Sequence, residues 1–330
     1  MNGVIQSFLS IILSVECIIG NLGNGFIALV NCTDWVRTTK MSSVDRILTA
    51  LAVSRIVLLW LTFIDWWVTV LNPAMWMSEN MSKMICISWT VANHFGIWLA
   101  TCLSIFYFLK IANYSNSIFL YLKWRVTKVV SVTGMMSLVL LFLEVLLMNI
   151  YDNVFAEYQR NMSYTSNLTI SVHCNNHPLF THILYMLVPF AVSVTTFLLL
   201  IFSLGKHLKR MQCSARGSRD AGTTAHMKAL RTMVISLLMY TSFFSSFLVQ
   251  VHNPKNQIFS AFLEAVIIAF LLVHSFVLIL GSSKLRQAFL LALRWLRCRA
   301  RDVELSNPQT LSGIILHVLE ENQITHYPGC

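Results

Sequence analysis

Polar side chains inside long apolar stretches are the residues of this sequence that could do chemistry. Trp89, Asn93 and Gly96 are separated by four and three residues, a spacing that places them on one face of a helix. An indole beside an amide, with a glycine that leaves room, suits a small ligand that stacks and forms a hydrogen bond. The same spacing also fits an ordinary contact between helices, so the residues alone leave both interpretations open.

Three further polar groups lie in other apolar stretches. Arg55 occurs within LAVSRIVLLW, and a guanidinium at the centre of a bilayer must face the interior of a helix bundle. We favour a structural hydrogen-bond hub for it over a direct role in ligand or ion binding. Glu264 lies near the end of its stretch, where its carboxylate either reaches the interface or faces a cavity for a cationic ligand. Tyr240 has a polar tip that could change partners, or it packs in the core.

The apolar stretches themselves predict the architecture. Hydrophobic residues make up 56% of the 330 residues and charged residues only 12%, too little charge to cover a soluble domain of this length. Stretches near twenty residues with few charges are typical of helices that span a bilayer. They cover about residues 8–30, 47–71, 85–109, 129–149, 182–204, 232–251 and 260–281. We therefore predict an all-α membrane protein, a bundle of seven transmembrane helices.

The distribution of basic residues predicts the orientation of this bundle. The net charge is +10, and most of the 24 lysines and arginines follow the first, third, fifth or seventh stretch. Because basic loops stay in the cytoplasm, we expect an extracellular N-terminus and a cytoplasmic C-terminus. Basic residues that flank membrane spans favour contacts with membrane lipids over a nucleic-acid partner. The sequons at Asn161 and Asn167 then lie outside the cell, where they predict glycosylation.

The chain beyond the seventh stretch divides into two parts. The segment SSKLRQAFLLALRWLRCR, residues 282–299, has an apolar stripe with basic residues around it. This pattern predicts a short amphipathic helix along the inner leaflet. Residues 302–330 are expected to form a cytoplasmic tail, so the seven-transmembrane domain is assigned to residues 1–301.

The sequence contains none of the enzyme and nucleotide-site motifs HExxH, GxSxG or the P-loop. The repeated halves and broken helices of many transporters are also missing. We therefore expect no enzymatic activity, no metal and no cofactor. An outward pocket and a basic inner face favour signal transfer by a bundle with two packings, one of which a ligand stabilises. A seven-span transporter or channel that uses Arg55 and Glu264 as pathway charges is the alternative.

Several stretches resemble the bitter taste receptors, the taste receptor type 2 family of G-protein-coupled receptors. They lie on all the cytoplasmic-side elements and span nearly the whole chain. The matching stretches are LGNGFI at 22–27, LAVSRI at 51–56, NHFGIWLATCLSIFYFLKIANYSNS at 93–117, LKWR at 122–125, LLLIFSLGKHLKRMQ at 198–212, GSRD with TTAHMKAL at 217–230, and HSFVLILG with KLRQAFL at 274–290.

The resemblance implies an agonist pocket in the outer third of the bundle. Trp89 and Asn93 match ligand-contacting positions on the third helix, and Glu264 matches a position that some members use on the seventh. Tyr240 matches an activation-linked aromatic residue on the sixth helix and is counted with the ligand-binding candidates.

The resemblance also implies a G-protein contact at the inner ends of the helices. Tyr107 and Lys110, in FYFLK, take the place of the acid–arginine pair of rhodopsin-like receptors, and Arg55 matches the second-helix arginine of the family. His274, at the start of the matching stretch HSFVLILG, completes the candidate activation residues. The family usually has Gly-Asn after the seventh helix, where this chain has Gly281-Ser282, so an amide cap is missing there.

From the resemblance we expect a bitter taste receptor in the plasma membrane. A small bitter compound would bind in the outer pocket, and a heterotrimeric G protein of the gustducin or Gi type would recognise the active packing. Another chemosensory receptor with seven helices, such as a pheromone receptor, is a second alternative. The sequence leaves the identity of the agonist and the oligomeric state open.

Overall fold

A computed structural model describes residues 3–71, 79–112, 114–162, 176–214, 221–252 and 257–305. These residues are almost entirely helical and include no strand, so the predicted all-α class is confirmed. The helices are α1 (Gly3–Thr38), α2 (Ser43–Leu71), α4 (Glu79–Ile111), α5 (Ser117–Trp124), α6 (Val126–Met162), α7 (Asn176–Ser214), α8 (Ala221–His252), α9 (Gln257–Gly281) and α10 (Ser283–Leu305).

Six helices are long and apolar enough to cross a membrane, namely α1, α2, α4, α6, α7 and α9. The protein is therefore a multi-pass membrane protein. Each of the seven predicted stretches falls within a single helix. The sixth stretch belongs to α8, where the apolar part with described side chains is the shorter segment Val234–Val249. A seventh span and the orientation of the termini stay predictions.

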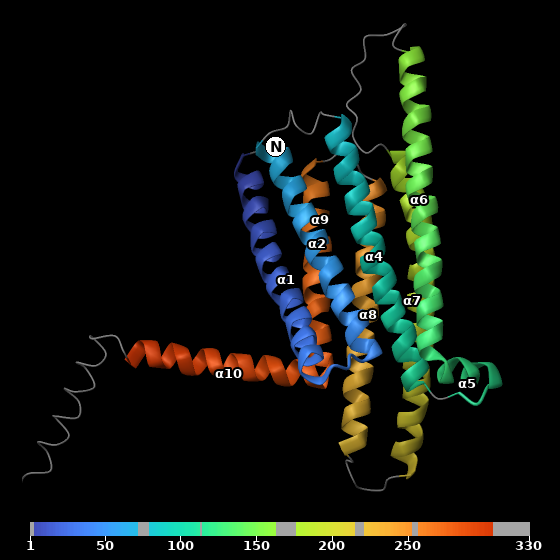
Figure 1. Ribbon diagram of the computed structural model, residues 1–330, viewed down its shortest axis with the longest axis vertical. Coiled ribbons are helices and arrows are strands. Elements are labelled where there is room, and N and C mark those ends of the chain that lie inside the picture. Colours follow the sequence, from blue (N-terminus) through green and yellow to red (C-terminus); the bar gives the residue numbers. More distant parts are fainter. Residues whose placement is uncertain are drawn as a thin grey trace, which may run out of the picture. The chain divides into compact units, whose positions relative to one another are not determined.

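Within the compact unit that ends at Gly281, six helices pack in a closed ring. α1 packs on α2, α2 on α4, α4 on α7, α7 on α8, α8 on α9, and α9 again on α1. α6 lies outside this ring and packs mainly on α4 (Figure 1). Because α6 exposes apolar side chains such as Leu138, Val139 and Phe142, most of its surface is suited to lipid.

Two apolar clusters of described residues lie within the ring. The aromatic cluster joins α2, α4, α7, α8 and α9 and contains Leu58, Ala92, Ile97, Met186, Tyr240, Phe243, Phe244, Phe247, Phe270 and Leu271. The second cluster joins α1, α2 and α9 and contains Leu9, Leu13, Cys17, Leu59, Trp66, Ala265 and Ile268. The helices α1 and α2 approach closely at Gly20, because a Cβ there would lie 2.8 Å from Cδ1 of Leu59 and would displace that side chain.

A short helix, α5, follows α4 and was not expected from the sequence. The side chain of Asn116 caps it by accepting a hydrogen bond from the backbone N–H of Ile118, at 2.9 Å. Phe119 of α5 is buried against the rings of Phe108 and Tyr114, with centroid distances of 5.5 and 5.3 Å. These contacts hold α5 against the end of α4.

The helix α10 belongs to a second unit, which begins at Ser282. Its first turn is capped by the hydroxyl of Ser282, which accepts a hydrogen bond from the backbone N–H of Leu285 at 3.4 Å. This hydroxyl occupies the position where we noted a missing amide. Of the predicted glycosylation sites, the side chain of Asn161 and all of Asn167 lie outside the described residues, as do residues 306–330 of the predicted tail.

Candidate functional site

The N-terminal part of α4 brings Trp89 into the interior of the ring. Trp89 is half-buried and packs against the aromatic cluster. Its indole stacks on the ring of Phe247 from α8, with the centroids 6.3 Å apart and the planes inclined by 14°. One turn further along α4, Asn93 is 2% exposed, so its amide is held inside the bundle. An aromatic plate and a buried amide therefore occupy adjacent turns of one helix.

Tyr240 of α8 lies in the same aromatic cluster as Trp89. Its ring stacks on Phe190 of α7, with the centroids 5.6 Å apart and the planes inclined by 21°. Its hydroxyl lies near the hydroxyls of Thr101 on α4 and Ser193 on α7. Tyr240 is thus a packed core residue whose polar tip lies among three helices.

Glu264 of α9 lies at the boundary between the two clusters. Ile267, three residues along α9, packs on the aromatic cluster, whereas Ile268 belongs to the α1–α2–α9 cluster. The carboxylate of Asp65 on α2 is close enough to act on Glu264 electrostatically. Asp65 is not among the predicted site residues, although a carboxylate within the apolar stretch 47–71 is a signal of a functional or paired group.

Arg55 is the centre of a buried polar network between α1, α2 and α9. Its Nη1 donates a hydrogen bond to Oγ of Ser275 at 3.0 Å, and its Nη2 donates to Nδ1 of His274 at 2.6 Å. The Ser275 hydroxyl in turn donates to Oδ1 of Asn24 at 2.8 Å. Since a guanidinium has only donors, Nδ1 of His274 is an acceptor. The network has the form of a structural hub that joins the first, second and last helices of the ring.

The other candidate activation residues lie near the C-terminal end of α4. Tyr107 is half-buried, and its ring meets Phe106 edge to face, at a centroid distance of 6.4 Å. Lys110 is exposed, and its Nζ lies 6.0 Å from the centroid of Phe106. Arg55 and His274 are buried, whereas Lys110 faces outward. The structure therefore separates the four residues into a buried pair and a more accessible pair.

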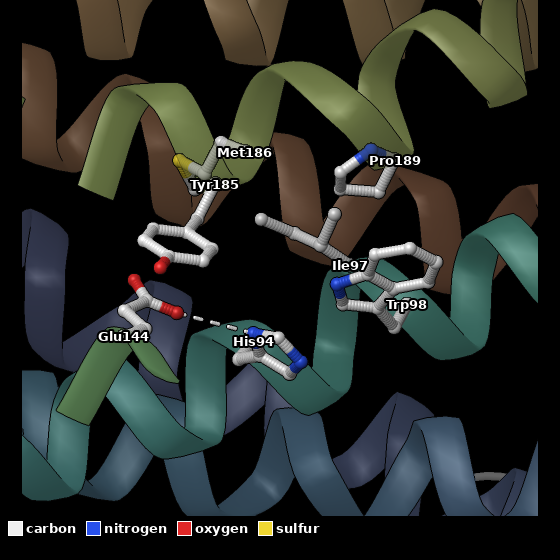
Figure 2. A pocket seen from close by; sticks show the side chains of 7 residues that line it. All are labelled: His94, Ile97, Trp98, Glu144, Tyr185, Met186 and Pro189. Carbon is white, nitrogen blue, oxygen red and sulfur yellow. Dashed lines mark hydrogen bonds and ion pairs between the residues drawn. The ribbon is translucent and has the colours of Figure 1, made fainter. Parts of the chain in front are cut away.

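A buried pair of ionisable residues, His94 on α4 and Glu144 on α6, was not predicted from the sequence. Nδ1 of His94 lies 3.2 Å from Oε2 of Glu144 (Figure 2). Nε2 of His94 lies 2.9 Å from the backbone carbonyl oxygen of Ser137 on α6. The side chains of His94 and Glu144 are 3% and 1% exposed. The two residues lie fifty positions apart in the chain, so the sequence gives no sign that they are neighbours.

The geometry determines how many protons this pair holds. A carbonyl oxygen only accepts, so Nε2 of His94 must carry a hydrogen that it donates to Ser137. One more proton then lies between Nδ1 and Glu144, either on the imidazolium or on the carboxyl group. The pair is electrically neutral in both cases. This neutrality explains how two ionisable groups can be buried in a membrane-spanning bundle.

A cavity of about 10 Å³ lies beside the pair, which is room for about one water molecule. Tyr185, Met186 and Pro189 of α7 complete its wall, and the Tyr185 hydroxyl points toward the Glu144 carboxylate (Figure 2). Within the described residues, no group of three or more His, Cys, Asp or Glu side chains is placed to hold a metal ion.

Comparisons with known proteins match almost the whole chain. The model of the family described as taste receptor protein (TAS2R) matches residues 1–297. Taste receptor type 2 member 140 of Rattus norvegicus is 49% identical over 312 residues, 93% of this chain and 100% of the relative. Member 109 of the same species is 51% identical over 304 residues, 91% and 95% of the two chains. Member 14 of Papio hamadryas is 50% identical over 311 residues, 93% and 97%.

A helical ring with membrane-length helices, polar groups in its interior and this similarity define a receptor of the G-protein-coupled class. The chain belongs to the taste receptor type 2 (TAS2R) family. It is a bitter taste receptor, which implies a small-molecule ligand and G-protein signalling. The family is one of receptors and not of enzymes, and the match decides against the transporter and pheromone-receptor alternatives.

Proposed function

We propose that this receptor binds bitter agonists in the outer part of the ring, between α4, α8 and α9. The observation that carries the proposal is the stack of Trp89 on Phe247 one turn from the buried amide of Asn93. A flat apolar molecule can stack there and form a hydrogen bond with the amide, a combination common in small-molecule sites. Glu264, together with Asp65, would favour an agonist that carries a positive charge.

Agonist binding would be transmitted through the aromatic cluster. Trp89 and Tyr240 both pack in this cluster, and the Tyr240 hydroxyl lies near those of Thr101 and Ser193. A ligand that separates Trp89 from Phe247 would therefore change how α8 packs on α4 and α7. Such a shift between two packings is the usual basis of receptor switching, because the ligand stabilises only one of them.

At the inner side, a heterotrimeric G protein of the gustducin or Gi type would bind the active packing. Tyr107 and Lys110 lie at the end of α4, where Lys110 is exposed and able to contact a partner. Arg55 and His274 would hold α2 to α9 while the inner ends of the other helices move. The basic inner loops add a positive surface suited to acidic groups of that partner.

The remaining assignments complete a plasma-membrane receptor with seven spans. α8 would provide the seventh span, the N-terminus would be extracellular, and the C-terminus cytoplasmic. Asn161 and Asn167 would carry glycans. α10 would lie along the inner leaflet as an amphipathic helix, residues 1–301 would form the receptor domain, and residues 302–330 its tail. The proposal leaves the oligomeric state open.

A calcium assay in transfected cells, with a co-expressed G protein and a broad set of bitter compounds, tests the pocket. Trp89→Ala and Asn93→Ala should abolish the response to at least some agonists or raise their half-maximal concentration about tenfold or more, since each removes a contact worth on the order of 1 kcal/mol or more. Surface expression should stay normal.

Two matched variants control for the substitutions themselves. Trp60 of α2 is exposed outside the ring, and Asn149 of α6 bonds only within its own helix in the described hydrogen bonds. Trp60→Ala and Asn149→Ala should therefore leave the dose–response curves unchanged. Unchanged curves in both Trp89→Ala and Asn93→Ala would overturn the pocket assignment.

A further inference from the structure

The contacts of α4 differ between its outer and inner halves. In the inner half, hydroxyl groups bind α7: Oγ1 of Thr101 lies 2.8 Å from Oγ of Ser193, and Oγ of Ser104 lies 3.0 Å from Oγ1 of Thr196. In the outer half, side chains bind α6 instead. His94 contacts Glu144 and the Ser137 carbonyl, as described above.

The α6 contacts lie at the level of the proposed agonist site. His94 follows Asn93 directly in the sequence, and successive residues of a helix point about 100° apart. Thr90, one turn before His94, adds a third contact, because its hydroxyl lies 3.8 Å from the sulfur of Met148 on α6. Trp89 and Asn93 thus face the ring interior, while Thr90 and His94, the residues that directly follow them, contact α6.

Apolar packing alone leaves the rotation of a helix about its axis poorly determined, because lipid tails and side chains are equally apolar. Hydrogen bonds with fixed donors and acceptors are directional and do determine it. His94 contributes two such bonds from one ring, to partners seven residues apart on α6. Its ring can satisfy both only when α4 presents one particular face to α6.

We infer that the His94–Glu144 pair is a positioning element for the agonist site. It fixes the rotation of the outer half of α4 and so keeps Trp89 and Asn93 directed into the ring, without contacting the agonist itself. This inference rests on the proposed agonist pocket for its functional consequence. Its structural content, the rotation of α4, stands independently of any ligand.

A labelling experiment tests the rotation without an agonist. Asn93→Cys is introduced, and the rate at which this cysteine reacts with a thiosulfonate reagent added outside the cell is measured. The receptor that keeps Asn93 gives the background reaction of the other cysteines. Adding Glu144→Leu should change the rate at position 93 several-fold, whereas adding Ser137→Ala should not. Ser137→Ala is the matched control, because it keeps the backbone carbonyl that His94 uses and removes only a hydroxyl bound to Gly134. An unchanged rate in Glu144→Leu would overturn the inference, whether or not the pocket binds agonists.

Dose–response curves then test the functional consequence. Glu144→Leu should raise the half-maximal concentration by about threefold to tenfold, the range of a buried interhelical hydrogen bond, for the agonists that depend on Asn93. Agonists that tolerate Asn93→Ala should also tolerate Glu144→Leu. A merely structural defect would instead lower surface expression and weaken all agonists alike, and that outcome contradicts the inference.

A conservative variant separates hydrogen bonding from charge. The amide of a glutamine can donate to Nδ1 of a neutral His94 while Nε2 still donates to Ser137. Glu144→Gln should therefore retain potency near that of the unmodified receptor. If Glu144→Gln is as damaging as Glu144→Leu, the hydrogen bond does not set the geometry, and the positioning role is overturned. If Asn93→Ala affects no agonist while the labelling rate changes as expected, the pocket assignment alone fails.

Discussion

At the scale of single residues, Tyr240 combines two contacts that a substitution can separate. Its ring stacks on Phe190, and its hydroxyl lies near those of Thr101 and Ser193. Tyr240→Phe keeps the stack and removes the hydroxyl. We expect a lower maximal calcium response with normal surface expression.

The control for this variant is Tyr121→Phe, because Tyr121 of α5 is exposed. It should behave like the unmodified receptor. A maximal response that is normal in Tyr240→Phe would contradict a role of the hydroxyl in transmission and leave Tyr240 as a packing residue.

Arg55 illustrates how the shape of a charged group matters as much as its charge. Its two terminal nitrogens serve two acceptors, Ser275 and His274. A lysine has one terminal nitrogen and cannot reproduce this fork. Arg55→Lys should therefore destabilise the receptor by about 1–3 kcal/mol, the cost of leaving a buried polar group without its partner. The measurement is the melting temperature of purified receptor in detergent.

Arg37 at the exposed end of α1 provides the matched control. Arg37→Lys should leave the melting temperature unchanged within error. Equal melting temperatures for Arg55→Lys and the unmodified receptor would show that charge alone suffices at position 55.

At the scale of helices, the sequence predicts where each helix lies along the chain better than it predicts which helices contact one another. Each predicted stretch lies within one helix, because a span must be apolar over about twenty residues wherever it packs. The helix ends differ, since polar residues extend α6 to Met162, beyond the predicted end at 149. α5 was missed because an eight-residue helix has little periodicity.

The interhelical pairs depend on which helices are neighbours and how each is rotated. Trp89 and Asn93 can be identified as candidates from their spacing on one helix. Arg55 can be identified because a charged side chain is costly to place in lipid. The pairing of His94 with Glu144 cannot be identified in this way, because it joins residues fifty positions apart on different helices. The family resemblance matches the identities of residues and does not show which side chains contact one another. It therefore assigns no role to His94.

The α4–α7 contact makes a quantitative prediction about two helices. Thr101 and Ser193 share a hydrogen bond of 2.8 Å between hydroxyl groups that are both buried. Thr101→Val and Ser193→Ala should each lower stability, and the double variant should lose less than the sum, with a coupling of about 0.6–1.7 kcal/mol. Melting temperatures of the four proteins provide the double-mutant cycle. Additive losses would mean that the two hydroxyls do not stabilise each other.

At the scale of the whole molecule, the distribution of charge predicts which sequons are used. Asn161 and Asn167 should both carry glycans, whereas the sequon at Asn31, buried in α1, should not. Asn161→Gln and Asn167→Gln should each remove one step of the mobility shift that a glycosidase produces on a gel. Asn31→Gln should leave the shift unchanged. A glycan at Asn31 would invert the proposed orientation.

The pairing of α6 with α4 has a consequence for how the receptor is made. Because α4 precedes α6 in the chain, His94 leaves the ribosome fifty residues before Glu144. A carboxylate in the middle of a helix is otherwise costly to insert. The imidazole of His94 provides a hydrogen-bonding partner for the Glu144 carboxylate, and the pair carries no net charge into the lipid. The order of the helices along the chain thus allows the acidic helix α6 to enter the membrane after α4, which carries its histidine partner.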